Sequence, residues 1–214
     1  MSSRIARRLA EARDRESGSA LIEFTIVSVL LFTLLFGIVE FGLAFRDRLT
    51  MANASQSAAR VLAALGDNKD ADLAALDALA STLQTLPNSG VDVVKYVDVF
   101  EADGNGDPVG ACNDGGGTLC NRFFYDPVTD PTCPWDPCPD PDAGWLGGDW
   151  ALGDRDVQLP GLDVVAVVVH FSHEWVTGAI VPLPDVSCDP VAVPGSICWQ
   201  DTAILRLEPQ VFAP

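Results

Sequence analysis

The sequence predicts an α+β protein that one long N-terminal transmembrane helix holds to a membrane. An apolar run of helical length lies near the N-terminus, and a second pattern of helical spacing follows it. Short β-branched segments come next, separated by turn-rich stretches that contain cysteines. We therefore expect a second helix and a small antiparallel sheet of about three or four strands, with loops tied by disulfides.

The apolar run lies between Glu16 and Arg46. A membrane span needs about 20 mainly apolar residues, and this run is long enough. It is apolar on all sides, whereas the core helix of a soluble domain has one apolar stripe. A cleaved secretory signal would have a shorter apolar core that ends in a small-residue site. We therefore expect residues 19–45 to form a transmembrane helix that stays attached.

Charge is distributed very unevenly along the chain. The first 15 residues hold five arginines and two acids, and they form a basic leader, residues 1–18. The positive-inside rule then predicts a cytoplasmic N-terminus and a single-pass protein of the cytoplasmic (inner) membrane, with an extracytoplasmic C-terminal domain. From Val61 onward 24 acidic residues face five lysines and arginines, a net charge of −19. Such a field repels nucleic acid, so no nucleic-acid partner is expected.

All six cysteines lie in the C-terminal half, and an even number outside the cytoplasm is typical of disulfides. Six cysteines allow 15 connectivities. Pairing between sequence neighbours is favoured: Cys112 with Cys120, Cys133 with Cys138, and Cys188 with Cys198. Zinc bound by Cys133 and Cys138 is the alternative, but a structural zinc site needs a second pair of ligands nearby. We expect no metal and no cofactor.

The remaining elements follow from periodicity and breakers. We expect the first helix to continue through residues 46–66 and to end at Gly66, before a head that spans residues 67–214. A second helix is predicted over Asp70–Leu86. Strands are predicted at Val91–Phe100, Leu162–Phe171 and Thr202–Phe212.

Two acids interrupt the apolar run, Glu23 near its start and Glu40 near its end. A carboxylate in hydrocarbon is costly unless it is protonated, paired or close to the interface, so it usually marks function. Glu40 lies less than two turns before Arg46, and a position near the outer surface explains it in part. Glu23 has no such explanation.

The residues from Gly18 to Phe24 read GSALIEF, follow the basic leader and open the apolar run. They resemble the processing site of type IV prepilins, where a membrane aspartyl peptidase cleaves after the glycine and leaves a glutamate at the fifth mature position. The resemblance implies removal of residues 1–18 and a mature chain that starts at Ser19. Gly18, Ser19, Glu23 and Phe24 would be the recognition residues. Glu23-Phe24 is similar to the Glu-Tyr pair of the Flp subclass, with one conservative departure at Phe24.

Further along, Gly37-Ile-Val-Glu-Phe-Gly42 and then Ala58-Ala59-Arg60 resemble the TadE-like family of the tight-adherence (Tad/Flp) pilus system. The valine-rich segment 163–171, the His173-Glu174-Trp175 motif and a last strand at 202–209 are also similar. The resemblance covers residues 16–66 closely and 160–212 more loosely. The acidic middle, rich in proline and cysteine, has no counterpart.

The resemblance implies a pilin-like lollipop fold and a minor pilin or pseudopilin that takes part in pilus assembly, adhesion and biofilm formation. Its partners would be other pilins and pseudopilins, bound through the N-terminal helix, with Glu23 and Glu40 as assembly residues. The prepilin peptidase and the inner-membrane platform of the pilus machine are further implied partners. After processing, the protein would also occur in the extracellular pilus. No G-x-S-x-G, P-loop or Cys/His nucleophile pair indicates an enzyme.

Several patterns leave alternatives open. Glu101–Asp107 resembles an EF-hand loop, but Cys112 stands where the bidentate glutamate belongs, so a hairpin turn is favoured. His170 and His173 are three apart on an extended chain and point to opposite faces, which disfavours a shared metal. The tryptophans of the 112–161 segment either form a binding surface or pack beneath the loops, and packing is favoured.

Two other functions compete with the pilin interpretation. One is an uncleaved assembly factor that stays in the membrane and never enters the filament. The other is an uncleaved, single-pass anchored extracytoplasmic binding module for calcium or another extracellular ligand. Its acidic turn and its Pro/Cys-rich segment would then form the binding site.

Overall fold

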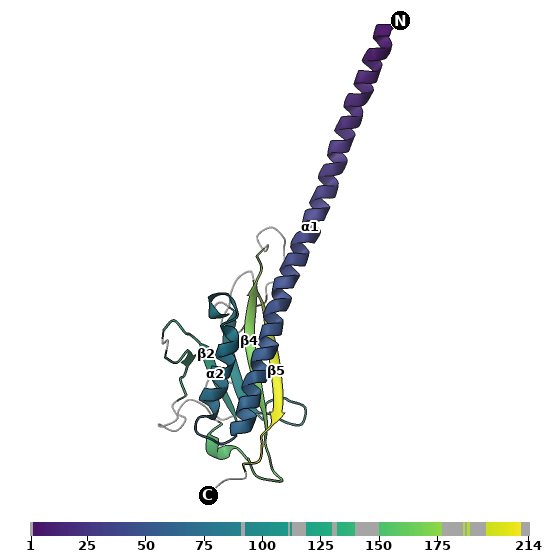
Figure 1. Ribbon diagram of the computed structural model, residues 1–214. Coiled ribbons are helices and arrows are strands. Elements are labelled where there is room, and N and C mark those ends of the chain that lie inside the picture. The colour runs from purple at the N-terminus through teal and green to yellow at the C-terminus, as the bar shows by residue number, and fades with distance from the viewer. Residues whose placement is uncertain are drawn as a thin grey trace. The chain divides into compact units, whose positions relative to one another are not determined.

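The computed structural model describes residues 2–90, 93–110, 112, 119–129, 132–139, 150–176, 186, 188 and 196–210, with only the backbone described at 2–17, 88 and 89. The chain divides into two compact units, Met1–Leu43 and Ala44–Pro214. Its principal elements are two helices and five strands (Figure 1): α1 Ser2–Leu65, α2 Ala71–Leu83, β1 Val94–Glu101, β2 Cys120–Tyr125, β3 Trp135–Asp136, β4 Val164–Glu174 and β5 Ser196–Arg206. The predicted α+β class is confirmed, with five strands where three or four were expected.

Helix α1 begins well before the expected start at Ser19, because the leader is also helical. The leader is rich in alanine, arginine, leucine and glutamate, which are good helix formers. The helix ends where the sequence predicts. Gly66 adopts φ +56°, and its N–H donates to the Leu62 carbonyl at 2.8 Å, as in a glycine C-cap.

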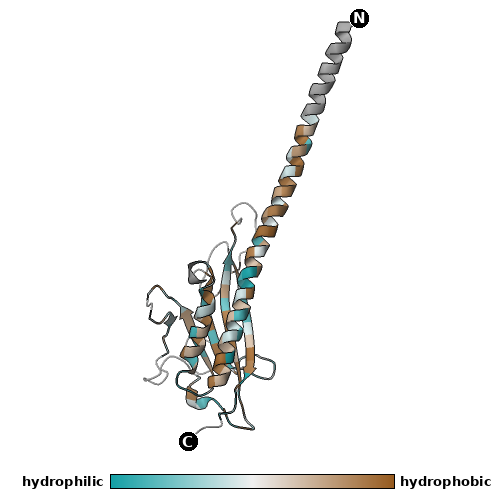
Figure 2. Ribbon diagram, viewed as in Figure 1, coloured by the Kyte–Doolittle hydropathy of each residue, from teal (hydrophilic) through white to brown (hydrophobic). Residues whose placement is uncertain are grey.

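The N-terminal unit, Met1–Leu43, presents apolar side chains on every side of the helix. From Leu21 to Phe41 the large apolar residues are mostly more than half exposed, and Figure 2 shows the hydrophobic colour along this part of α1. By length and composition, the Gly18–Leu65 part of the helix is apolar enough to cross a membrane. Thr25 and Thr33 donate their hydroxyls to the carbonyls of Leu21 and Val29, so these polar groups need no water.

In the second unit, Ala44–Pro214, α2 and the C-terminal part of α1 pack on one face of the sheet (Figure 1). Alternate residues of each strand supply the sheet side of this core, as the period of two requires. The largest fully buried side chains include Met51 and Leu62 of α1, Leu76, Leu79 and Leu83 of α2, and Val97, Val99, Phe123 and Phe171 of the sheet. A smaller cluster around Phe100 and Val168 lies on the opposite face of the sheet.

The strands have the order β3-β2-β1-β4-β5, and all neighbours are antiparallel. Three strands were predicted, with boundaries that differ by a few residues. β5 differs most: it begins at Ser196 instead of Thr202 and ends at Arg206, while the last predicted residues, 211 and 212, lie outside the described part. β2 and β3 were missed because the segment around them is rich in proline, yet Cys120–Tyr125 itself contains none.

The six cysteines form three disulfides, each between sequence neighbours, which is the pairing favoured from the sequence. Cys112–Cys120 ties the connection between β1 and β2 to the first residue of β2. The second disulfide brackets β3, and the third attaches the residues around Cys188 to β5. Because Cys133 and Cys138 are bonded to each other, they are not the thiolate pair that the zinc alternative requires.

Candidate functional site

The residues of the predicted processing site lie together on α1, inside the N-terminal unit. Gly18, Ser19, Glu23 and Phe24 are all exposed. Ser19 and Glu23 are four positions apart, so they lie on one face of the helix with about 6 Å of rise between them. The Glu23 carboxylate therefore stands one turn from the backbone nitrogen that cleavage after Gly18 would convert into a free amine.

Glu40 has a different environment from Glu23. It is 2% exposed, and it is not without an interaction partner. The two glutamates are 17 residues apart, which is about 25 Å along a helix, so the structure does not bring them together. They are two separate candidates for a role in assembly.

Beyond residue 43, two polar contacts attach α1 to the sheet. The Nδ1 atom of His173 on β4 lies 2.7 Å from a carboxylate oxygen of Asp47. Two turns later, Ser55 donates its hydroxyl to Asp201 on β5 at 2.6 Å. Asp47 and Ser55 are eight residues apart and share the buried face of the helix, but no sequence signal identified their partners. Both contacts lie within the second unit.

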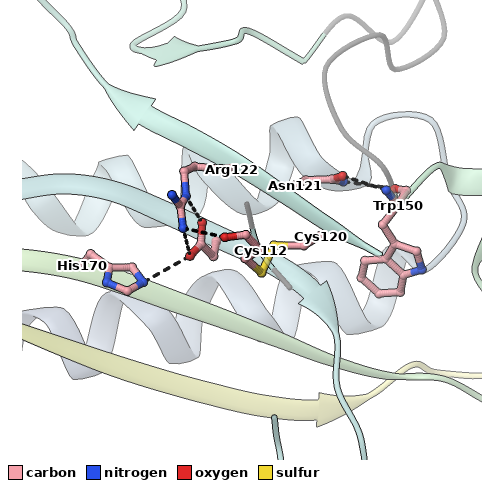
Figure 3. Close-up of a disulfide and its surroundings, with 7 residues drawn as sticks. Cys112, Cys120, Asn121, Arg122, Trp150 and His170 are labelled. Carbon is pink, nitrogen blue, oxygen red and sulfur yellow. Dashed lines mark hydrogen bonds and ion pairs between the residues drawn. A yellow bond between two sulfur atoms is a disulfide. The ribbon is translucent and has the colours of Figure 1, made fainter. Parts of the chain in front are cut away.

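A charged cluster lies on the face of the sheet away from the helices (Figure 3). Arg122 of β2 donates from Nε and Nη2 to the two oxygens of Asp98 on β1, at 2.7 and 3.0 Å. Nε2 of His170 on β4 lies 3.2 Å from the same carboxylate. The imidazole and the guanidinium both stack on the Tyr96 ring. Arg122 also donates to the carbonyl of Cys112, which links this cluster to the first disulfide.

Burial alone would raise the pKa of Asp98, but hydrogen bonds from His170 and Arg122, together with their charges, hold it below its ordinary value. Asp98 was not singled out from the sequence. The sequence does offer an indication, because Asp98 is a charged residue within an otherwise apolar predicted strand. A charged side chain that is buried at such a position needs a partner. The cluster joins three strands.

A second buried charge pair organises the corner between the two helices. The guanidinium of Arg155 contacts both oxygens of Asp72 in the first turn of α2, at 2.7 and 2.9 Å. It also donates to the Gly66 carbonyl at the end of α1 and lies over the Trp150 ring. Asn121 fixes the backbone of Trp150 from β2 (Figure 3). This cluster is structural.

The tryptophans that the structure describes in the 112–161 segment pack inside the molecule, as favoured from the sequence. Trp135 and Trp150 are both buried. Trp145 lies outside the described residues. The described part of this segment therefore offers core packing and no exposed tryptophan surface.

The acidic turn after β1 is a closed hairpin-like turn. Ala102 and Pro108 form an antiparallel bridge across it, and Gly106 adopts φ +91°. The backbone N–H groups of Asn105 and Asp107 donate to the Asp103 carboxylate and lower its pKa. These local donors use oxygens that a calcium ion would need. Among the described residues, no group of three or more His, Cys, Asp or Glu side chains is arranged to hold a metal.

His170 and His173 point to opposite faces of β4, as the spacing predicted. The first belongs to the Asp98 cluster, and the second contacts Asp47 on the helix side. The structure therefore brings neither histidine toward the other, and each has its own carboxylate partner.

The comparison with known families concerns the N-terminal helix. Residues 18–60 match the model of the family described as TadE-like protein. No curated protein and no solved structure matches the chain. The matched segment begins at Gly18 and includes Glu23, Glu40 and Arg60, so it contains every residue of the predicted processing site. The looser resemblance of residues 160–212 stays a prediction. Over residues 18–60, the chain is therefore similar to the TadE-like proteins.

Proposed function

We propose that this protein is a TadE-like minor pilin or pseudopilin that takes part in the assembly of a tight-adherence type IV pilus. A prepilin peptidase would first remove residues 1–18. One observation carries the proposal: within the TadE-like segment, a carboxylate stands one turn after the predicted cleavage point on a helix whose apolar side chains are exposed. Its role is structural, in line with the family, and no catalytic activity is proposed.

The exposed apolar helix needs surroundings that exclude water. Hydrocarbon provides them while the subunit is in the membrane, and the packed helices of neighbouring subunits provide them in a filament. Glu23 is the exception on this surface, because a carboxylate moved out of water loses its hydration unless a charge or hydrogen-bond donor replaces it.

Cleavage would supply that partner. It creates a positively charged amine at Ser19, which can pair with Glu23 of a neighbouring subunit when the two helices pack side by side. A buried pair of this kind adds little stability by itself, but leaving one charge without the other is costly. The pairing would therefore favour one axial register. Before cleavage the amine does not exist, so processing would permit assembly.

The same proposal gives a location to the leader and the head, and it names the partners of the protein. The arginine-rich leader would stay in the cytoplasm, and the acidic head would lie outside the inner membrane. Other pilins and pseudopilins, the peptidase and the membrane platform of the pilus machine would be its partners. Glu40, further along the helix, would act in assembly independently of Glu23.

The first prediction concerns processing. In cells that contain the prepilin peptidase, the mature chain is expected to begin at Ser19, and in cells that lack it the chain is expected to keep residues 1–18. Intact mass and N-terminal sequencing measure this directly. A chain that retains Arg4 to Arg15 in both strains would contradict the proposal and favour a permanent membrane anchor.

The second prediction concerns Glu23. Glu23→Ala is expected to be processed and inserted in the membrane but to be lost from sheared pili, because the amine of Ser19 then has no carboxylate to meet. Immunoblots of membrane and pilus fractions measure the ratio. Thr25→Val is the matched control, since the Thr25 hydroxyl is satisfied by its own helix and its loss should change little. If pili contained Glu23→Ala at the wild-type level, the role in register would be wrong.

A further inference from the structure

Strand β5 lies at the edge of the sheet, and among the described residues only its beginning has a backbone neighbour on the outer side. Its inner side pairs with β4 along its whole length. On the outer side, Val186 donates its N–H to Ser196 and accepts the N–H of Cys198, at 2.9 and 2.7 Å. The Cys188–Cys198 disulfide holds this short parallel bridge in place. Among the described residues, no other backbone group bonds to the outer side of β5.

The N–H and C=O groups of successive residues in a strand point alternately to its two sides. Because the N–H of Cys198 points to the outer side of β5, the backbone groups of every second residue after it do so too. Gln200, Thr202, Ile204 and Arg206 direct their N–H and C=O groups away from β4. All four residues are exposed, and Ile204 is 44% exposed. An open row of backbone donors and acceptors of this length is a template for another strand.

A cleft of about 280 Å³ runs beside this open edge. It is lined by Gln56 and Arg60 of α1 and by residues 202–205 of β5. All of these residues belong to the second unit. A strand added to β5 would therefore lie next to the exposed side of α1.

A positive side chain, Arg60, lines this cleft, although the head as a whole is acidic. Arg60 and Arg206 are both exposed, and within the described structure neither makes an ion pair or a side-chain hydrogen bond. Arg60 lines the cleft, whereas the Arg206 side chain lies with its ladder partner Val164 on the other face of the sheet. Because Arg60 has no internal partner among the described residues, it favours an incoming segment that carries carboxylates.

We propose that this edge binds an extended, acidic segment of a partner protein, which adds a sixth strand to the sheet. The added strand would follow the line that the Val186 bridge begins, pair with the backbone of residues 200–206 and place carboxylates near Arg60. A second copy of β5 fits less well, because the one acid of β5, Asp201, already accepts a hydrogen bond from Ser55. This inference concerns the head and does not depend on processing of the helix.

The test uses the full chain in detergent micelles and a blocked peptide of alternating valine and glutamate. Amide hydrogen exchange is measured residue by residue along β5. The outward amides of Thr202, Ile204 and Arg206 are expected to exchange about tenfold more slowly with the peptide, since each gains a ladder hydrogen bond. The amides of Ala203 and Leu205 already face β4 and serve as the internal reference.

Charge-reversal variants distinguish specific binding of the peptide at this edge from non-specific binding. Arg60→Glu, on the helix and outside the ladder, is expected to weaken peptide binding about tenfold or more. Arg48→Glu, another exposed arginine of α1 but not part of the cleft lining, is the matched control and should leave binding unchanged. A peptide of alternating valine and lysine should not bind.

Three results would overturn the proposal. One is no slowing of the outward amides at millimolar glutamate peptide. Another is slowing that Arg60→Glu leaves unchanged. The last is slowing that appears without peptide and grows with protein concentration, which would assign the edge to a second copy of the chain. Each is independent of cleavage after Gly18, so failure here and failure of the pilin proposal are distinguishable.

Discussion

Arg155→Met is expected to lower the free energy of unfolding of the head by about 3–5 kcal/mol, the usual cost of removing one member of a buried ion pair. The Arg155 side chain is fully buried, and its partner Asp72 is 4% exposed. Methionine fills part of the space but leaves the Asp72 carboxylate buried, with only a long contact from Asn121 at 3.5 Å. The Gly66 carbonyl at the end of α1 loses a donor as well.

Chemical denaturation of the full chain in detergent, followed by tryptophan fluorescence, measures this loss. Arg48→Met is the matched control, because Arg48 is exposed on α1 and its replacement should change stability by less than about 0.5 kcal/mol. The double variant Asp72→Leu, Arg155→Met removes both charges and should recover part of the loss. A single variant within about 1 kcal/mol of wild type would show that the pair does not hold this corner.

Arg122→Leu is expected to destabilise the head by about 2–4 kcal/mol at neutral pH. The change leaves the Asp98 carboxylate buried between strands with His170 as its remaining partner. The loss is smaller than for Arg155 because the Arg122 side chain keeps 20% of its surface exposed, which weakens the pair by solvent screening.

The loss of stability caused by Arg122→Leu is expected to become smaller as pH falls. In the wild type, the pKa of Asp98 is lower in the folded state than in the unfolded state, so its contribution is complete above the unfolded value. That contribution is lost as pH falls through the folded pKa. Without Arg122 a larger share of the burial penalty is uncompensated, and this penalty disappears when Asp98 is protonated. The difference between variant and wild type should therefore shrink as pH falls below about 4.

Urea unfolding midpoints of the two proteins across the acidic range measure that difference. The control makes the same comparison in the Asp98→Asn background: the stability difference between Asp98→Asn and the double variant Asp98→Asn, Arg122→Leu should not depend on pH in this range, because the carboxylate is absent from both proteins. A difference that stays constant from neutral to acidic pH would mean that loss of the guanidinium acts through packing on Tyr96 and not through the Asp98 charge.

The features predicted correctly from sequence are local ones. The apolar helix and its end at Gly66 follow from residues within a few turns of one another, and the three disulfides join cysteines that are 8, 5 and 10 positions apart. The match over residues 18–60 also depends on one continuous segment. Boundaries were less accurate, because pairing with a neighbouring strand decides where a strand ends: β5 stops at Arg206, where its partner β4 begins at Val164.

By itself, the sequence determined the membrane-type helix, its two acids, the opposite directions of His170 and His173, and the α+β class, because helical and strand periods express themselves over short stretches. Only the tertiary structure decided which charges are buried together and which strand edge has no partner along most of its length among the described residues. Asp98 meets Arg122 across 24 residues, Asp72 meets Arg155 across 83, and Asp47 meets His173 across 126. No local pattern encodes such pairs, since the packing of strands, helices and loops brings them together.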